Sequence, residues 1–293
     1  MKIDRKAAAL AAASLTSVAF AALAPSDAAA RLEAKMYAIT VWNAGCAGGQ
    51  RDAWDDMVDA WYDEVTNAGV EVFGWCLWGH CGEAYSRDGR LVNSTIRNSY
   101  FADAAVVAWG GDSTRLDEGD AVMIGTHGFD GAGNDYGGTM RIDEAGAGDC
   151  NMMRSEMRLG NQDLEFLHLS SCNSMDANQW GAWLGATRGV HQVDGFHGFM
   201  WIGGGLVSNY SNFADDAFDG SIAMAWLDNH YVPDVSGTDD QCPVAYSVGT
   251  SASDAINRLL TERYDNVLTD VANPTWWAAT YWIGCDPQNE SAM

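Results

Sequence analysis

Two short apolar segments limit the fold of this chain more than any other feature of its sequence. Residues 121–124 (AVMI) form a continuous apolar run, and residues 164–169 (LEFLHL) form a second, mostly apolar segment. Short runs bounded by turn-forming or polar residues are typical of central strands in a parallel sheet, because such strands are buried on both faces. The two segments therefore predict an α/β protein with a mainly parallel sheet.

The surrounding sequence alternates between strand and helix patterns. Residues 36–42 are apolar and β-prone, residues 51–67 place large apolar side chains on one helical face, and residues 70–75 are again typical of a strand. This strand–helix–strand order indicates the start of an α/β sheet. Further helices are predicted over residues 95–109, 176–187, 212–230 and 253–268, and further strands over residues 190–193 and 275–283. A glycine-rich loop is predicted over residues 129–138 and a small hairpin arm over residues 139–143.

The first thirty residues have the three parts of a secretory signal peptide. A basic start is followed by an alanine-rich, uncharged stretch over residues 7–24 and by the small residues 28–30. We therefore expect residues 1–30 to be a signal peptide and residues 31–293 to be a single α/β domain with loop insertions, arranged as a three-layer sandwich. The longest uncharged stretch after it, residues 195–214, contains too many glycines and polar residues to span a membrane. The predicted location is secreted or periplasmic.

The charge balance excludes several classes of partner. The chain has 16 Lys+Arg against 40 Asp+Glu, a net charge of −24. An acidic surface argues against nucleic acid and against anionic membranes as partners. The same acidity is compatible with calcium binding. We interpret the helical aspartates mainly as a solvated face, with calcium ligation as the alternative: Asp52, Asp55, Asp56 and Asp59.

The cysteine count is odd. Because the chain has seven cysteines, an oxidising compartment allows at most three disulfides and leaves at least one thiol over. Cys76 and Cys81 bracket a short loop and are expected to form a local disulfide. The pairing of the others stays open, and the absence of any CxxC pair gives no support to a zinc knuckle or a thioredoxin-type site.

Two reactive side chains follow the two apolar segments. His127 and Gly128 come shortly after residues 121–124, and Cys172 comes shortly after residues 164–169. Since the C-terminal ends of parallel strands share one edge of a sheet, neighbouring strands would bring His127 and Cys172 together. A thiolate is a nucleophile, and an adjacent imidazole can take the thiol proton. The pattern predicts a catalytic dyad.

The residues beside the dyad suit the same chemistry. Gly128 has no side chain, so its N–H can approach a substrate carbonyl and form an oxyanion hole with the N–H of Cys172. The helix predicted after Cys172 would favour a thiolate through its dipole. Cys172 would also be the thiol that the odd count leaves unpaired. This chemistry requires no cofactor and no metal.

The order of these motifs resembles the caspase–gingipain–legumain group of cysteine peptidases (clan CD), including the CHAT domains. The segment 167–173 (LHLSSCN) is similar to the CHAT cysteine motif, and the segment 183–201 is similar to the strand and pocket loop that follow that cysteine. The resemblance covers residues 121–201 and implies a caspase-hemoglobinase-like fold and a peptide or protein substrate. It implies Cys172 as nucleophile, His127 as general base and Gly128 as oxyanion donor. No caspase-type QACxG sequence is present.

Several neighbouring residues have weaker claims to a role. Asp194 and His197 are expected in the wall of the substrate pocket, because they follow the strand after Cys172. His197 is also a rival base, since His197-Gly198-Phe199 repeats His127-Gly128-Phe129. A transition-metal site at His191 and His197 would instead make the protein a metal hydrolase.

Three residues near the cysteine have structural alternatives. His168 points either toward the site or into a layer of the sheet, and Ser170 and Ser171 lack the GxSxG elbow of a serine hydrolase. The resulting prediction is a secreted cysteine hydrolase of peptidase type that uses a His127/Cys172 dyad. The alternative is a non-enzymatic secreted module on the same fold, which would use the 13 tryptophans and the aspartates to bind carbohydrate or calcium-dependent partners.

Overall fold

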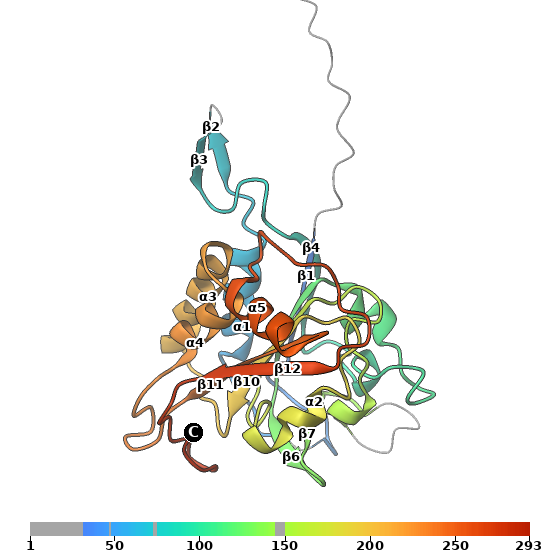
Figure 1. The fold of residues 1–293 in the computed structure, drawn as a ribbon. Coiled ribbons are helices and arrows are strands. Elements are labelled where there is room, and N and C mark those ends of the chain that lie inside the picture. Colours follow the sequence, from blue (N-terminus) through green and yellow to red (C-terminus); the bar gives the residue numbers. More distant parts are fainter. Residues whose placement is uncertain (1–31, 47, 73–74, 144–149) are drawn as a thin grey trace, which may run out of the picture. The chain divides into compact units, whose positions relative to one another are not determined.

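A seven-stranded sheet forms the centre of the fold in a computed structural model that describes residues 32–46, 48–72, 75–143 and 150–293 (Figure 1). The expected signal peptide, residues 1–30, lies outside the described residues. The strand order is β12-β11-β10-β9-β5-β1-β4; β11 is antiparallel to both of its neighbours, β10 and β12, and the other neighbouring pairs are parallel. The strands are β1 (Glu33–Ala38), β4 (Ser86–Val92), β5 (Ala121–Gly125), β9 (Phe166–Ser170), β10 (Gln192–His197), β11 (Cys242–Gly249) and β12 (Trp276–Tyr281).

The central strands are buried on both faces. In β5, Ala121 and Met123 pack into the core on one side of the sheet, whereas Val122 and Ile124 pack into the core on the other side. This alternation explains why residues 121–124 are apolar without interruption. The predicted α/β class and the mainly parallel sheet are confirmed.

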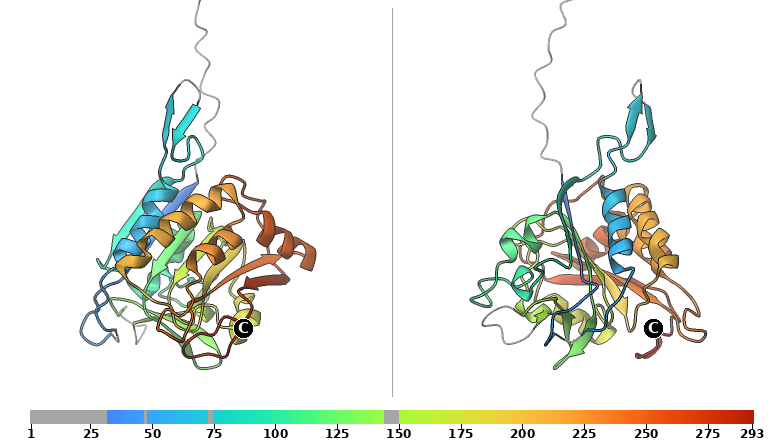
Figure 2. Two further views of the ribbon diagram at one scale, coloured as in Figure 1. Left: turned by 90° about the vertical axis from the view of Figure 1, so that its left-hand side faces the viewer. Right: turned by 180° about the vertical axis from the view of Figure 1, so that it is seen from behind.

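Different elements cover the two faces of the sheet (Figure 2). One core is formed with the helices α1 (Trp54–Val65), α3 (Val207–Asp219), α4 (Ile222–His230) and α5 (Ala252–Thr261). The other core is formed with α2 (Trp180–Trp183), several short turns and the three-stranded sheet β6 (Gly128–Gly131), β7 (Asp135–Thr139) and β8 (Asn151–Met153). This arrangement is compatible with a three-layer sandwich.

The strand predicted over residues 70–75 does not join the central sheet. Instead, β2 (Val70–Val72) pairs with β3 (Trp75–Trp78) in a separate two-stranded sheet, and β4 takes the place beside β1. The sequence of β4, SRDGRLV, is mostly polar because this strand lies at the edge of the sheet and is partly exposed. Edge strands therefore lack the continuous apolar pattern that identified the central ones.

The helix predicted over residues 95–109 is wrong. Within that segment the structure has turns and a short 3₁₀ helix at Asn98–Tyr100. Asp103 is held by longer-range bonds: its carboxylate accepts from Asn161 Nδ2 at 2.6 Å, and its N–H donates to the carbonyl of Glu156 at 2.9 Å. Such contacts override a helical pattern in the sequence.

Other predicted boundaries also shift. The helix predicted over 212–230 is two helices, because Ser221 caps the start of α4 by accepting from the N–H of Met224 at 3.3 Å. The loop predicted over 129–138 is the hairpin β6–β7, whose turn contains Gly133 and Asn134 at positive φ. β11 was not predicted.

Three disulfides join six of the seven cysteines. They are Cys46–Cys150, Cys76–Cys81 and Cys242–Cys285, and Cys172 is free. The predicted local disulfide and the predicted free thiol are confirmed.

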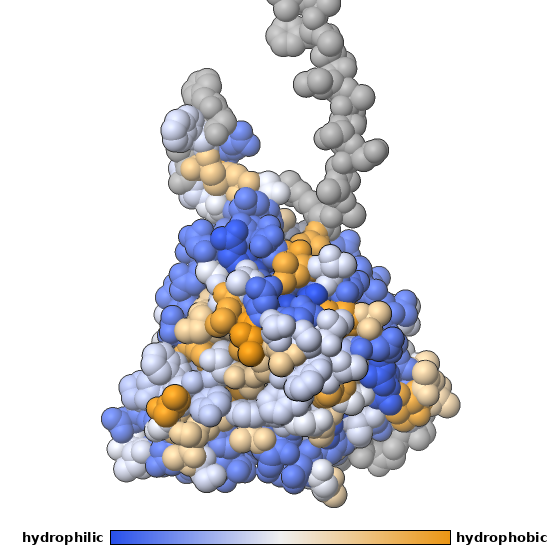
Figure 3. Space-filling view, in the orientation of Figure 1, coloured by the Kyte–Doolittle hydropathy of each residue, from blue (hydrophilic) through white to orange (hydrophobic). Residues whose placement is uncertain are grey.

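No helix in the described part of the chain combines the length and the apolar character that crossing a membrane requires. Hydrophilic side chains cover most of the face shown in Figure 3, with apolar ones scattered among them.

We expect the loss of the Cys46–Cys150 disulfide to destabilise the fold by about 2–5 kcal/mol. This bond joins positions 104 residues apart, so its removal frees a long loop in the unfolded chain. The double variant Cys46→Ser/Cys150→Ser is compared with Cys76→Ser/Cys81→Ser, whose disulfide joins positions only 5 apart. Urea denaturation measures both, and a larger loss for the short-range pair would contradict the expectation.

Candidate active site

The ends of two neighbouring strands bring His127 and Cys172 to one pocket. β5 and β9 are adjacent and parallel, with Gly125 opposite Ser170, so the residues after them emerge at the same edge of the sheet. His127, Gly128 and Cys172 line a pocket of about 590 Å³. Its other lining residues are mostly large and apolar: Trp54, Phe199, Met200, Trp201 and Ile202, with Arg51 and Gln288.

Gly128 lies against the backbone of the cysteine loop. A Cβ at this position would lie 2.0 Å from the carbonyl oxygen of Cys172 and 2.4 Å from Ser171 Oγ, so only glycine fits. The N–H of Thr139 donates to the carbonyl of His127 at 2.8 Å. Because bonded and non-bonded pairs alternate in an antiparallel ladder, the next pair, Gly128 opposite Gly138, is non-bonded. The N–H of Gly128 is therefore not used by the hairpin.

The surroundings of His127 define its tautomer. Its Nε2 lies 3.0 Å from the carbonyl oxygen of Gly49, and its ring packs against the rings of Trp42 and Trp54 at centroid distances of 4.6 and 5.1 Å. Since a carbonyl oxygen only accepts, Nε2 carries the proton and Nδ1 keeps its lone pair. Partial burial lowers the pKa of His127, and the positive charge of Arg51 lowers it further. His127 is thus a neutral imidazole with a basic Nδ1.

Cys172 is a partly buried thiol held by the backbone of Met200. The N–H of Met200 donates to Sγ at 3.5 Å, and the Met200 carbonyl lies 3.7 Å from the same sulfur. Burial raises the pKa of the Cys172 thiol, although the bond from Met200 and the charge of Arg51 act in the opposite direction. Among the described residues, no hydrogen bond joins His127 to Cys172. The pocket therefore holds a neutral thiol and a neutral imidazole at rest.

The helix predicted over residues 176–187 is shorter than expected and begins further from Cys172. Its only α-helical part, α2, begins at Trp180 and has four residues, so no helix terminus supports the sulfur. The loop after Cys172 is instead held by Asp176, which is fully buried. The Asp176 carboxylate accepts from Asn173 Nδ2 at 2.9 Å and from the N–H of Gly198 at 2.7 Å. This carboxylate, which the sequence analysis missed, ties the cysteine loop to the loop after β10.

His197 lies behind this loop rather than in the pocket wall where it was expected. Its side chain is buried, with Nδ1 3.3 Å from Asp176 Oδ1 and Nε2 3.0 Å from the carbonyl of Ser291. Burial opposes protonation of His197, but the bonds to Asp176 and Ser291 outweigh it and raise its pKa. His197 is a structural partner of Asp176 and does not reach the pocket that His127 lines.

Asp194 also lies outside the pocket, in the core between the sheet and the helices. It is fully buried, and its carboxylate accepts from His168 Nδ1 and from Gln192 Nε2, both at 2.8 Å. His168 Nε2 accepts from the hydroxyl of Tyr264 at 2.8 Å. Of the two alternatives for His168, the structure shows the one inside a layer of the fold.

The metal hydrolase alternative does not fit the positions of its histidines. His191 precedes β10 and His197 ends it, so a whole strand, roughly 20 Å long, separates them. His191 is fully buried and its Nδ1 bonds Glu262 Oε1 at 2.5 Å. The two imidazoles therefore cannot share one ion.

The remaining candidates have structural partners. Ser170 Oγ lies 2.6 Å from the hydroxyl of Tyr210, and Ser171 Oγ accepts from the hydroxyl of Tyr136 at 2.9 Å. Of the aspartates considered for calcium, Asp59 is paired with Arg90 at 2.8 Å. No group of three close metal-ligating side chains in the described part of the chain includes Asp52, Asp55, Asp56 or Asp59.

Part of the pocket wall was not predicted from the sequence. Arg51 and Trp54 come from the loop before α1 and from its first residue, far from the cysteine motif in the chain. Trp54 fits the apolar face of α1, so its pattern indicated only a core residue. In contrast, Phe199, Met200 and Trp201 fall at the end of the segment that was expected to form the pocket loop.

Comparison with known proteins adds a family but no activity. Among curated proteins, none matches the chain. Residues 82–282 match the family described as "Domain of unknown function (DUF6345)". The matched region includes His127, Gly128 and Cys172 and spans more than half of the chain. The chain belongs to the DUF6345 family.

Proposed function

We propose that this protein is a secreted cysteine hydrolase, a peptidase of the caspase–gingipain–legumain type that uses a His127/Cys172 dyad. One observation carries the proposal: the chain's free cysteine and a neutral histidine come from the ends of adjacent parallel strands and line the same pocket. The α/β sheet and the order of the two motifs along it support the caspase-hemoglobinase-like fold. The three disulfides support a secreted or periplasmic location.

The proposed reaction follows from the groups in the pocket. His127 Nδ1 takes the thiol proton as Sγ of Cys172 attacks the carbonyl carbon of a peptide bond. The N–H groups of Gly128 and Cys172 hold the oxyanion of the tetrahedral intermediate. The protonated His127 then gives its proton to the leaving amine, and a thioester remains on the sulfur. Water, deprotonated by His127, hydrolyses the thioester and restores the thiol.

The backbone around the dyad supports this role for the two amides. The Gly128 N–H is not used by the β6–β7 ladder, and the Cys172 N–H makes no backbone hydrogen bond within the described residues. The absence of a side chain at Gly128 lets its backbone approach the loop that carries Cys172. Trp54, Phe199 and Trp201 give the pocket apolar walls, which suit a large apolar side chain beside the scissile bond.

A peptide library tests the proposal. The purified chain is incubated with a mixture of fluorogenic and unlabelled peptides, and products are identified by mass spectrometry with and without prior treatment with iodoacetamide. We expect cleavage that the alkylation abolishes and that a metal chelator leaves unchanged. No cleavage, together with slow alkylation typical of an inert thiol, would favour the non-enzymatic binding module.

The pKa shifts predict how the free thiol reacts with pH. Because burial raises the pKa of Cys172, the reactive thiolate stays a minority form at neutral pH. We expect the rate of alkylation by iodoacetamide to keep rising above pH 8.5, the ordinary pKa of a cysteine. Mass spectrometry of the intact protein gives the rate at each pH. A plateau below pH 7 would show a preformed thiolate–imidazolium pair and contradict the neutral resting state.

The lowered pKa of His127 predicts how catalysis falls off at acidic pH. A general base must be neutral, so activity is lost as the pH falls through the pKa of His127. We expect the acidic limb of kcat/KM to lie below about pH 6.5, the ordinary value for histidine. Arg51→Met, which removes the positive charge that lowers this pKa, should move the limb upward. A limb above pH 7 in the unmodified protein would contradict this assignment.

A further inference from the structure

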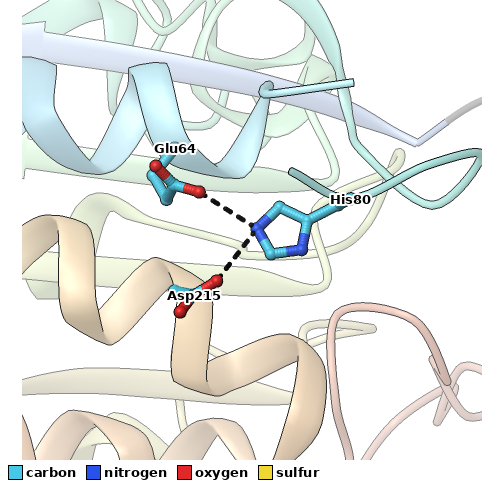
Figure 4. A group of neighbouring side chains, drawn as sticks. All are labelled: Glu64, His80 and Asp215. Carbon is cyan, nitrogen blue, oxygen red and sulfur yellow. Dashed lines mark ion pairs between the residues drawn. The ribbon is translucent and has the colours of Figure 1, made fainter. Parts of the chain in front are cut away.

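A second cluster of reactive side chains lies at the other end of α1. His80 Nε2 is 3.3 Å from Glu64 Oε1 and 3.7 Å from Asp215 Oδ1, so an imidazole and two carboxylates converge from three different segments (Figure 4). Glu64 lies near the C-terminal end of α1, Asp215 lies in α3, and His80 follows β3. All three ligand atoms lie within 4.8 Å of one another.

The Nε2 atom of His80 points between the two carboxylates but has no hydrogen-bond partner there. His80 is only 8% exposed, and its Nε2 makes no hydrogen bond within the described part of the chain. A buried polar atom without a partner is costly, so a ligand between the two carboxylates would stabilise this nitrogen. We propose that Glu64, His80 and Asp215 bind a divalent transition-metal ion, with Zn²⁺ as the best match.

The distances favour a metal ion over a direct ion pair. In tetrahedral coordination, bonds of about 2.0–2.2 Å place neighbouring ligand atoms about 3.3–3.6 Å apart. Of the two separations from His80 Nε2, 3.3 Å falls within this spacing and 3.7 Å exceeds it by 0.1 Å. A charge-assisted hydrogen bond from a protonated imidazole would instead be about 2.7–2.9 Å long.

The donor atoms select the kind of ion. Ca²⁺ and Mg²⁺ prefer oxygen ligands, whereas imidazole nitrogen suits Zn²⁺ and its transition-metal neighbours. The side chain of Asp215 is 66% exposed and that of Glu64 is 27% exposed, so one side of the cluster is open to solvent. Water can supply the fourth ligand there, and the ion can reach the cluster from the same side.

The surroundings hold the imidazole of His80 in place before any ion binds. The His80 ring stacks on the ring of Phe218 at a centroid distance of 3.7 Å and an interplanar angle of 14°. The backbone N–H of His80 donates to the carbonyl of Asn67 at 2.8 Å. The neighbouring Cys81 is fixed by its disulfide to Cys76. The imidazole therefore needs little further ordering when an ion binds.

This cluster is separate from the pocket with Cys172. Trp54 lines that pocket at the first residue of α1, and Glu64 is ten residues further along, a rise of about 15 Å. An ion bound here would therefore not touch the dyad. It would tie the loop after β3 to α1 and α3, and its expected effect is on stability.

Zinc titration of the full chain tests the site. Affinity and stoichiometry are measured by competition with a chromophoric chelator, in a Cys172→Ala background that removes the free thiol. We expect one tight Zn²⁺ per chain and a higher Tm with Zn²⁺ than with chelator. His80→Gln and Asp215→Asn should each weaken binding at least about tenfold, since even second-shell partners of a metal are worth 10–100-fold in affinity.

A matched control separates ligation from charge. Asp219→Asn removes a carboxylate from the same helix at an exposed position outside the cluster, and it should leave the affinity unchanged. If His80→Gln does not fold, Asp215→Asn decides, because Asp215 is exposed and is not needed for packing. Absence of Zn²⁺ binding, equal affinity in all variants, or Ca²⁺ binding as tight as Zn²⁺ would each overturn the proposal.

Discussion

Replacing Cys172 with alanine is expected to abolish hydrolysis and to leave the fold intact. The sulfur is the nucleophile of the proposed mechanism, and the alanine side chain cannot form the thioester on which the second half of the reaction depends. Loss of a nucleophile typically leaves only the small rate enhancement that oxyanion and binding groups supply. We expect a decrease in kcat of more than about 10⁴-fold.

The structural cost of this substitution is small. Cys172 is only partly buried, and its contacts with Met200 are weak sulfur hydrogen bonds. Circular dichroism and the unfolding free energy of Cys172→Ala should therefore match those of the unmodified protein within about 1 kcal/mol. His127→Ala offers a second test, since it removes the base and keeps the thiol. Undiminished peptide cleavage by Cys172→Ala would refute the dyad.

The central strands and their reactive ends could be predicted because strand position follows from local pattern. Residues 121–124 are buried on both faces, so their sequence is apolar throughout and identifies them as a central strand. Adjacent parallel strands place their C-terminal ends together, which is a property of the fold class rather than of particular contacts. The placement of His127 and Cys172 at one pocket followed from these two facts without knowledge of any side-chain contact.

The wall of the pocket could not be predicted in the same way. Its residues come from separate segments, and the loop that carries Arg51 reaches the pocket through contacts distant in sequence. The Arg51 N–H donates to the carbonyl of Thr40 at 3.0 Å, and the disulfide of Cys46 holds the same loop to Cys150. Nothing in the local sequence specifies these contacts, so no sequence pattern around Arg51 could indicate that it lines the pocket.

Asp194 was misplaced for a different reason. It follows the cysteine motif in the expected order, but a carboxylate on a strand can point to either side of the sheet, and its position along the strand decides how far from the edge it lies. Asp194 pairs in register with His168 in the middle of the sheet, several residues before the end of β10. Its partners are therefore in the core.

Substitution of Asp194 with alanine is expected to destabilise the protein by about 3–5 kcal/mol, the cost of removing one partner from a buried pair. His168 and Asp194 are both fully buried, and Asp194 also accepts from Gln192. Without the carboxylate, the N–H groups of His168 and Gln192 would have no acceptor in an apolar surrounding formed by Trp61, Phe213 and Trp226.

Asp194→Asn distinguishes a core role from a pocket role. Its amide oxygen can still accept one of the two N–H groups, so the loss of unfolding free energy should be smaller than for Asp194→Ala, and the folded variant should keep the hydrolytic activity of the unmodified protein. Urea denaturation gives the unfolding free energies, with the exposed Asp219→Ala as a control expected within about 0.5 kcal/mol of the original. If Asp194→Asn is stable but hydrolyses peptides more slowly, Asp194 has a role in the pocket. A substitution in the core lowers activity only by lowering the fraction of the protein that is folded.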